Sequence, residues 1–206
     1  YRFYGRSRLG PGLARVRLDG QGEVAYSNLG FVVLAVCLAA AAQTKFNDLL
    51  REAIFEPAGM ASARCQPCSK KGLVRGRGAW MTGGRRWHEP LPGAGGIDCS
   101  ITDLSRWLQV NLEPDLTSLH DAIRLYHEPR VEGPIGYVGL AWQIRGDIHW
   151  HNGGTGGFQS FLGFVPGRVG AALLSNSASR EGAQFDRLAA RWLKRSITGG
   201  DDCSPE

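Results

Sequence analysis

The chain lacks any apolar run long enough to cross a bilayer. Its longest apolar run, residues 31–42, contains about a dozen residues, whereas a membrane-spanning helix needs roughly 20. The first residues also lack the basic, apolar and small-residue order of a secretory signal. The sequence therefore predicts no membrane span, and we expect residues 31–42 to form a buried helix. Nothing in it identifies the cellular compartment.

Methionine is missing from the first position, where the chain has Tyr1. Because no signal sequence is recognised, we expect the chain to begin inside a longer protein. Its 206 residues, of which 43% are hydrophobic and 21% charged, have ordinary globular composition. They fit one domain or a large piece of one.

Cysteine is scarce, and its spacing suggests no disulfide framework in a chain of this length. The five cysteines are an odd number. Cys65 and Cys68 have the spacing of two metal ligands, but a zinc site needs a second pair, and His88 is a distant partner. His120 and His127 could share a helical face, but a solvated surface is the better interpretation because Pro and Gly follow closely. We therefore predict neither a metal nor another cofactor.

A basic cluster interleaved with tryptophans lies between residues 70 and 87. Such a patch suits nucleic acid or an anionic lipid, but the stretch is also rich in glycine, which favours a solvated loop. We expect no nucleic-acid partner, and salt-dependent retention on a heparin or DNA column would show the opposite. The cluster consists of Lys70, Lys71, Arg75, Arg77, Trp80, Arg85, Arg86 and Trp87.

Helical periodicity dominates the middle of the chain. After Thr44, a candidate N-cap, apolar residues recur at helical spacing until Pro57 ends the segment. A second amphipathic helix is predicted to begin at Thr102-Asp103 and to stop before Pro114.

From about residue 136 the pattern changes to short strands, and consecutive short connections imply antiparallel pairing. A closing amphipathic helix, from about residue 182 to 195, presents one apolar stripe that would pack on a sheet face. The order of helices, then strands, then a closing helix predicts an α+β fold in two lobes. One lobe, over about 20–135, is mainly helical, and the other, over about 136–196, contains the antiparallel strands and the closing helix. The predicted strands are residues 137–144, 148–151, 158–165 and 169–175.

Tyr26-Ser27-Asn28 ends a turn-rich stretch and opens the apolar helix. In an extended segment, residues two apart point the same way, so the phenol and the amide are predicted to face one side. A phenol relays protons, and a carboxamide binds a substrate amide through its donor and its acceptor. The alternative is that Asn28 only caps the helix.

His151-Asn152-Gly153-Gly154 follows a predicted strand and precedes Thr155-Gly156-Gly157. Glycine on a strand lets a ligand approach closely and leaves backbone N–H groups free to bind an oxyanion. A histidine beside that surface titrates near neutral pH, because its ordinary pKa is about 6.5. The alternative is a glycine-rich hairpin with an exposed histidine. No phosphate-binding pattern is present.

Four landmarks, in their order and spacing, resemble those of the serine β-lactamase family, which includes class C β-lactamases, D,D-peptidases, D-aminopeptidases and related esterases. The resemblance extends over nearly the whole chain. It implies a β-lactamase/transpeptidase-like fold, with a helical lobe, an antiparallel sheet and a C-terminal packing helix, from which the N-terminal part is missing. The landmarks are Tyr26-Ser27-Asn28-Leu29-Gly30, Ile54-Phe55-Glu56-Pro57-Ala58-Gly59-Met60, Gly93-Ala94-Gly95-Gly96-Ile97 followed by Thr102-Asp103-Leu104, and His151-Asn152-Gly153-Gly154-Thr155-Gly156-Gly157-Phe158.

The resemblance implies roles for five residues. The Tyr-x-Asn motif of the family supplies a catalytic tyrosine and a substrate-binding asparagine, which fall on Tyr26 and Asn28. A Lys-Thr-Gly or His-x-Gly motif follows in the family, and its counterpart implies a catalytic His151 and a substrate-binding Gly153. The next residue, Gly154, would offer its N–H to the oxyanion hole.

The sequence departs from the family in one important respect. The family's first motif, Ser-x-x-Lys, carries the serine that is acylated and the lysine that helps to deprotonate it. It occurs nowhere in the 206 residues, and only 25 residues precede Tyr26. Ala58, where the family usually has leucine, is a tolerated change.

The resemblance therefore implies a serine hydrolase that attacks an amide or ester through an acyl-enzyme. Its substrate would be a small molecule or a short peptide, and the nucleophile would lie in a missing N-terminal segment of its own domain. The alternative is a non-catalytic remnant or binding module that keeps the cleft between the lobes. Tyr26, Asn28, His151 and Gly154 are predicted to line that cleft.

Histidine at position 151 weakens the expectation of β-lactam hydrolysis. A permanent cation facing the substrate carboxylate is replaced by a group that is mostly neutral at pH 7. Esters or short D-amino-acid peptides are the better expectation. We also predict marginal stability for the isolated chain, because without the N-terminal elements a sheet edge and an apolar face lie open.

Overall fold

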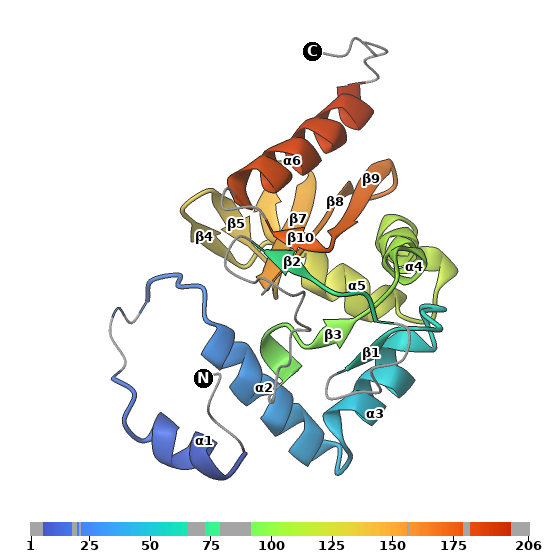
Figure 1. Ribbon diagram of the computed structural model, residues 1–206. Coiled ribbons are helices and arrows are strands. Elements are labelled where there is room, and N and C mark those ends of the chain that lie inside the picture. Colours follow the sequence, from blue (N-terminus) through green and yellow to red (C-terminus); the bar gives the residue numbers. More distant parts are fainter. Residues whose placement is uncertain are drawn as a thin grey trace.

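A six-stranded antiparallel sheet forms the centre of the computed structural model (Figure 1). The structure describes residues 6–17, 20, 22–65, 73–78, 92–155, 157–178 and 182–198. The strands lie side by side in chain order, because each returns beside the previous one through a short connection. The strands are β4 (Val131–Gly133), β5 (Gly136–Val138), β6 (Gln143–Arg145), β7 (Ile148–Thr155), β8 (Phe158–Val165) and β9 (Val169–Ser175).

Each face of the sheet covers its own apolar cluster. On one face Phe161 is buried with Ala189 and Leu193 of α6, so the predicted packing of the closing helix on the sheet is confirmed. On the other face Phe164 is fully buried and packs with side chains of α4 and α5. The predicted strands over 158–165 and 169–175 are confirmed as β8 and β9. The helices of these two layers are α4 (Ile101–Leu112), α5 (His120–His127) and α6 (Gly182–Thr198).

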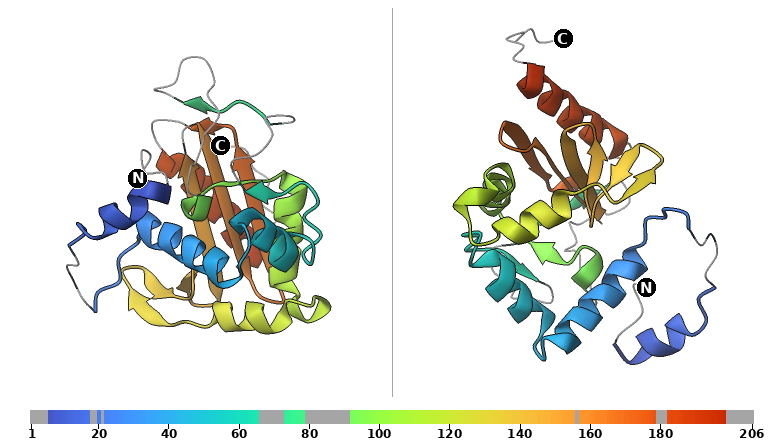
Figure 2. Two further views of the ribbon diagram at one scale, coloured as in Figure 1. Left: turned by 90° about the horizontal axis from the view of Figure 1, so that it is seen from below. Right: turned by 180° about the vertical axis from the view of Figure 1, so that it is seen from behind.

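The remaining elements lie on the α5 side of the sheet (Figure 2), except the strands β2 and β10, which lie near the start of α6 (Figure 1). Two short ladders link distant parts of the chain: β1 pairs with β3 antiparallel, and β2 pairs with β10 parallel. The elements are α1 (Arg6–Leu13), α2 (Asn28–Ala41), α3 (Phe46–Leu50), the π-helical turn η1 (Arg51–Phe55), the 3-10 turns η2 (Pro92–Ala94) and η3 (Pro114–Leu116), and the strands β1 (Arg64–Cys65), β2 (Arg77–Gly78), β3 (Ile97–Asp98) and β10 (Ser177–Ala178).

α2 is buried on one side only, so the prediction of a buried helix was too simple. Val32, Ala35 and Ala39 are buried, whereas Leu34 and Leu38 remain 49% and 47% exposed. Among the described helices none is by itself long and apolar enough to cross a membrane. α2 and the helical segment after it pass that test only as a pair, with a bend of 87° between them.

Two helices begin at residues other than those predicted. α4 is capped by Ser100 rather than by Thr102: the N–H of Asp103 donates to Ser100 Oγ at 3.1 Å, and the N–H of Ser100 donates to the Asp103 carboxylate at 2.9 Å. Thr44 is not the N-cap of α3, a position that Lys45 takes without a side-chain hydrogen bond. The N–H of Thr44 instead bonds back to the last turn of α2 at 3.1 Å.

The strand predicted over residues 137–144 is divided into β5 and β6. A tight turn separates them, in which the N–H of Gly139 donates to the carbonyl oxygen of Trp142 at 2.9 Å. A Cβ on Gly139 would lie 2.8 Å from the carbonyl oxygen of Tyr126 in α5. The glycine therefore allows the chain to turn against the end of α5, an approach that alternation of residue types does not reveal.

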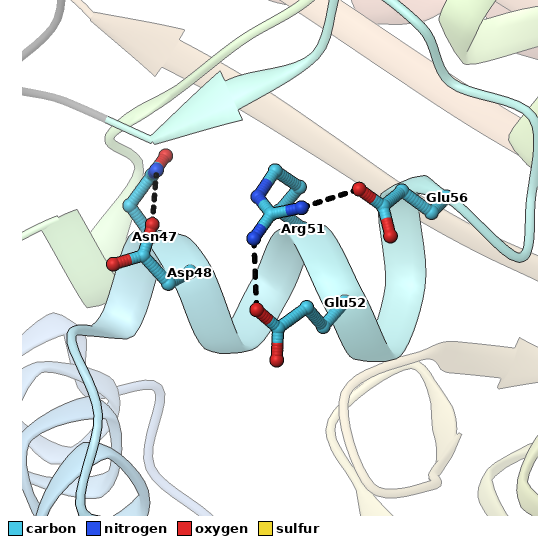
Figure 3. A network of polar contacts seen from close by, with 5 residues as sticks. All are labelled: Asn47, Asp48, Arg51, Glu52 and Glu56. Atoms are coloured by element: carbon cyan, nitrogen blue, oxygen red, sulfur yellow. Dashed lines mark hydrogen bonds and ion pairs between the residues drawn. The ribbon is translucent and has the colours of Figure 1, made fainter.

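The helix predicted after residue 44 changes pitch at Arg51 (Figure 3). The guanidinium of Arg51 donates to Glu56 and, at 2.8 Å, to Glu52 across the π-helical turn. All three side chains are well exposed, so solvent screening keeps these ion pairs weak. Phe55 and Met60, by contrast, are 3% and 6% exposed. The landmark of residues 54–60 therefore supplies buried side chains to the core, and its charged residues are on the surface.

His127 is half-buried rather than on a solvated surface, contrary to the prediction, whereas His120 is exposed as predicted. Its Nε2 lies 2.9 Å from Oδ1 of Asn111, which is fully buried and also accepts from the hydroxyl of Tyr126. Its ring centroid lies 4.9 Å from that of His149, whose Nε2 is 3.0 Å from the carbonyl oxygen of His127. The partners are far away in sequence, so the histidine spacing alone pointed to the wrong environment.

Acidification from pH 6.5 toward pH 4 should weaken the fold through His127. Burial, and secondarily repulsion from His149, lowers the pKa of His127 from 6.5 to about 4. The folded chain keeps this ring neutral while the unfolded chain takes up a proton, so its contribution to stability is complete above pH 6.5 and is lost toward pH 4. Because the ring is partly exposed, we expect a loss of about 1–2 kcal/mol.

Urea unfolding at about pH 7 and about pH 4.5 measures this loss. His127→Gln is the control, because the amide can still donate to Asn111 but does not titrate. The variant should lose less stability than the original chain over this range. Equal losses in both would show that other groups cause the acid sensitivity.

Candidate active site

Tyr26 and Asn28 lie at the start of α2. Ser27 is the N-cap, and its Oγ accepts from the N–H of Gly30 at 3.0 Å. Asn28 is the first helical residue, so the alternative that it serves as the cap is wrong. The Tyr26 hydroxyl donates to Oδ1 of Asn28 at 3.2 Å. The phenol and the amide therefore face the same side, as the spacing predicted.

β7 extends beyond its neighbour β6, which leaves part of it without a second partner strand. The ladder between them ends where Gln143 pairs with Trp150, whereas β8 pairs with β7 as far as Thr155. In the described chain, residues 151–155 are thus paired on the β8 side only. In an antiparallel strand alternate residues direct their N–H groups to one edge. This edge of β7 therefore has backbone donors available for a ligand.

The structure brings Tyr26 and His151 together although they are distant in the chain. Their ring centroids lie 6.1 Å apart, with an angle of 37° between the ring planes. Tyr26 is 64% exposed, and His151 is half-buried. The start of α2 and the extended part of β7 thus lie next to each other, with the phenol close to both the amide of Asn28 and the imidazole.

The environment of His151 favours its neutral form. Burial lowers its pKa below the ordinary value, while the backbone hydrogen bond with Asn152 acts in the opposite direction. At neutral pH the ring is therefore uncharged and one of its nitrogens can accept a proton. It does not supply the permanent positive charge that a lysine would.

Gly153 and Gly154 keep the strand surface beside His151 open. A Cβ on Gly153 would lie 2.6 Å from Oγ of Ser160, its partner on β8. A Cβ on Gly154 would meet nothing within 4 Å, so its backbone is accessible. The sequence prediction of a glycine surface next to the histidine agrees with this geometry. The prediction that these residues line a cleft stays a prediction.

Asn152 points to the other face of the sheet, where its Nδ2 donates to the carboxylate of Asp186 in α6 at 2.8 Å. This bond ties the strand that carries the site to the closing helix. Successive residues of a strand point to opposite faces, so Asn152 anchors the strand to α6 while His151 faces α2.

No activated serine is formed within the described ranges. Ser27 uses its oxygen as the cap of α2, and no hydrogen bond among the described residues joins a serine to Lys45 or Lys194. Ser160 faces Gly153 across the strand pair. The described chain therefore contains no serine that is hydrogen-bonded to a lysine, the pairing that activates the nucleophile in a Ser-x-x-Lys motif.

One neighbour of the site was not recognised in the sequence. Gly76 is buried against the β7–β8 turn, where a Cβ on it would lie 2.9 Å from the carbonyl oxygen of Gly157. Two glycines facing each other are the only available signal, and they are 81 positions apart in the printed sequence. The segment of residues 73–78 is thus held at the end of the strand that carries His151.

The other candidates from the sequence fall largely outside the described residues. Cys68, His88 and most of the basic cluster lie there, although Arg75 and Arg77 do not. Cys65 is buried, and its N–H donates to Oδ1 of Asn47 at 2.9 Å. Within the described ranges no three His, Cys, Asp or Glu residues are grouped so that they could hold a metal ion.

Comparisons with known proteins find relatives of this chain in both sequence and fold. The family model described as Beta-lactamase matches residues 12–194. The chain is 27% identical over 165 residues to "Unguisins hydrolase ungD'" of Aspergillus campestris (strain IBT 28561), covering 68% of this chain and 30% of that protein. It is 27% identical over 175 residues to the D-alanyl-D-alanine-carboxypeptidase/endopeptidase AmpH of Escherichia coli (strain K12), covering 74% and 45%.

A solved class C beta lactamase from Rhodobacter sphaeroides has the same fold. It superposes with a TM-score of 0.81 over 95% of this chain and 66% of that chain, at 19% identity. The matched part of the chain spans less than half the length of the two curated relatives.

Proposed function

The chain belongs to the beta-lactamase family, and from this premise we propose that it forms most of a serine hydrolase domain that acts on an amide or ester through an acyl-enzyme. The approach of Tyr26 to His151, beside the unpaired edge of β7, is the observation that carries the proposal. Two groups able to move protons lie next to backbone donors there, which is the arrangement that acyl transfer needs.

Each side chain of the site has a part in this mechanism. Tyr26 and His151 transfer protons to and from the attacking and leaving groups, because a phenol and a neutral imidazole both accept and donate. Asn28 binds the amide of the substrate through its carboxamide. The backbone N–H of Gly154, on the open strand surface next to Gly153, stabilises the oxyanion of the tetrahedral intermediate.

The nucleophile of this mechanism comes from a Ser-x-x-Lys segment that is not among the 206 residues. Such a segment of the same domain would pack on the apolar surfaces that the chain leaves exposed. Leu34 and Leu38 on α2 and Leu188 and Trp192 on α6 are between 47% and 58% exposed. Their burial would stabilise the complete domain, since exposed apolar groups of this size mark contact surfaces.

The substrate of the proposed reaction is a small molecule or a short peptide. The two curated relatives are named as a hydrolase and as a D-alanyl-D-alanine carboxypeptidase/endopeptidase. A neutral His151 in place of a lysine favours esters or short D-amino-acid peptides over β-lactams.

A second function, a non-catalytic binding module, is favoured by the lack of Ser-x-x-Lys in the chain. The site would then bind the same ligands without acylation. Sequencing the gene upstream of Tyr1 separates the two functions. An in-frame apolar helix with Ser-x-x-Lys supports the hydrolase, and a start codon next to Tyr1 supports the binding module.

The chain by itself should not hydrolyse a chromogenic ester or a chromogenic cephalosporin at an enzymatic rate. Without an activated serine, binding and the oxyanion hole alone leave roughly 10³ to 10⁴-fold over water, with no burst. Stopped-flow absorbance and intact mass measure turnover and acylation.

Extending the chain with the upstream segment should restore a burst and a stoichiometric acyl adduct on the serine of that segment. Tyr26→Phe in the extended protein should lower the rate of acylation, because the phenolic proton relay is removed. An adduct on the short chain, or turnover abolished by one serine-to-alanine change within it, would contradict the proposed position of the nucleophile.

A further inference from the structure

The part of β7 that carries the candidate site has few side chains to hold it in place. Among the described strands, residues 151–155 pair with β8 on one side only. Gly153 and Gly154 have no side chain, and glycine has more backbone freedom than any other residue. The ring of His151 faces α2. Asn152 is therefore the residue of this stretch whose side chain can tie the strand to the layer on its other face.

Asp186 in α6 is the partner of that side chain. Nδ2 of Asn152 donates to the Asp186 carboxylate at 2.8 Å. A hydrogen bond to a carboxylate is roughly twice as strong as one between neutral groups, and short lengths of this kind are typical of it. Asp186 is half-buried, whereas Asn152 is exposed. The bond joins two residues that are 34 positions apart.

The packing of α6 gives Asp186 a fixed position. The helix lies on the sheet through Ala189 and Leu193, which are 0% and 3% exposed. Phe185, next to Asp186 in the chain, packs in the same apolar cluster as Phe161 of β8. α6 and α2 lie on opposite sides of the sheet (Figure 1). The site-bearing part of β7 is thus held from the α6 side, while its imidazole faces the α2 side.

Asn152 also contacts the imidazole of the site through its backbone. Burial lowers the pKa of His151, and a hydrogen bond between its ring and the backbone of Asn152 raises it. A hydrogen bond that raises the pKa of a histidine favours the protonated ring, so the ring N–H is the donor and the backbone carbonyl the acceptor. In the neutral ring this bond holds the proton on one nitrogen and leaves the other free to accept one. Asn152 therefore connects the Asp186 carboxylate to the tautomer of His151.

We propose that Asp186 is a positioning residue of the candidate site. Through Asn152 it holds the peptide units of residues 151–154, and with them the ring of His151 and the N–H of Gly154, in the arrangement that proton transfer and oxyanion binding need. This inference rests on the proposed function. Acyl transfer is sensitive to such positioning, since a displacement of about 1 Å can cost roughly 100-fold in rate. Asp186 acts through Asn152 and not on the reacting groups themselves.

NMR of the chain itself tests the inference without turnover. At about pH 8, where an ordinary histidine is neutral, the nitrogen chemical shifts of the His151 ring report its tautomer. Hydrogen exchange reports the opening of residues 151–155. Asp186→Ala should convert the single tautomer into a mixture and speed exchange over residues 151–155 about 5-fold. Asp186→Asn should preserve both, because its amide oxygen can still accept from Asn152.

Two controls separate positioning from charge and from a general loss of stability. In an Asn152→Ala background, Asp186→Ala should have no further effect on the tautomer or on exchange, because the connection is already broken. Asp147→Asn removes an exposed carboxylate from the turn that precedes β7, at the end of the strand away from the site. This change should leave the tautomer of His151 and the exchange of residues 151–155 as they are.

An unchanged tautomer in Asp186→Ala would overturn the inference, as would an equal effect of that change with and without the Asn152 side chain. Faster exchange spread evenly over the whole sheet would show a stabilising role only, and would overturn it too.

Turnover tests the same residue in the protein extended by the upstream segment. Asp186→Ala should lower kcat about 10-fold at an unchanged KM, because positioning acts on the reaction step and not on binding. A raised KM with an unchanged kcat would overturn the inference. The proposed hydrolysis fails separately: if the tautomer responds as expected but the extended protein forms no acyl adduct, the connection of Asp186 to His151 stands and the acyl-enzyme mechanism does not.

Discussion

Asp103→Ala should lower the free energy of unfolding by about 3 kcal/mol, because the Asp103 carboxylate has four hydrogen-bond donors and is almost fully buried. Asp103 is 3% exposed. Ser100 donates to it from its N–H at 2.9 Å and from its hydroxyl at 2.8 Å. Ser62 donates from its N–H at 3.1 Å and also from its hydroxyl. The alanine variant leaves these donors without their partner and removes half of the capping box of α4.

The same carboxylate connects two landmarks of the sequence. Ser62 follows the turn that contains Met60, whereas Asp103 lies in the first turn of α4. Burial alone would raise the pKa of Asp103, but the hydrogen bonds from Ser62 and Ser100 outweigh it and lower the pKa below 3.8. Its contribution to stability is therefore complete above pH 3.8 and is lost as the pH falls further.

Urea unfolding at neutral pH measures the effect of Asp103→Ala. Asp121→Ala is the matched control, since that side chain also lies in the first turn of a helix but is 93% exposed. It should change stability by less than about 0.5 kcal/mol. Asp103→Asn, which keeps the shape and one acceptor oxygen, should fall between the two. Similar losses in Asp103→Ala and Asp121→Ala would refute the role of the buried carboxylate.

The parts of the fold that the sequence predicted are those with local signals. Strands β8 and β9 are bounded by turn residues and contain uninterrupted apolar stretches, so their limits could be placed correctly. The closing helix, α6, could be predicted because its apolar residues recur at helical spacing on one side. The resemblance to the serine β-lactamase family then supplied the arrangement of these elements, which the family model and the solved relative support.

The errors arise where a distant partner decides the local structure. Gly139 breaks a strand because α5 approaches it. His127 turns inward because Asn111 and His149 lie beneath it. None of these contacts produces a periodic pattern of residue types in the sequence.

The candidate site could be predicted only in part, because some of its residues are close in sequence and others are not. Tyr26 and Asn28 are two residues apart, so their common direction follows from spacing, and the juxtaposition with His151 came from the order of motifs. Arg75 and Arg77 were recognised only as members of a basic cluster. The position of their segment at the β7–β8 turn depends on the contact between Gly76 and Gly157, which neither composition nor periodicity indicates.

Gly157→Ala should cost about 3–4 kcal/mol, because it combines an unfavourable backbone angle with a collision against backbone atoms. Gly157 has φ +94°, and an added Cβ would lie 2.8 Å from the carbonyl carbon of Gly76 and 2.9 Å from the nitrogen of Arg77. Gly167→Ala is the matched control: its φ is +68°, but its Cβ would meet nothing within 4 Å. That variant should lose only the backbone preference, about 1–2 kcal/mol.

Urea unfolding compares the two variants, and hydrogen exchange at the N–H of Arg77 reports the local contact. This N–H bonds to Asn176 in the folded chain, so Gly157→Ala should speed its exchange and Gly167→Ala should not. Equal costs in the two variants, with unchanged exchange at Arg77, would show that the segment of residues 73–78 is not fixed by the turn.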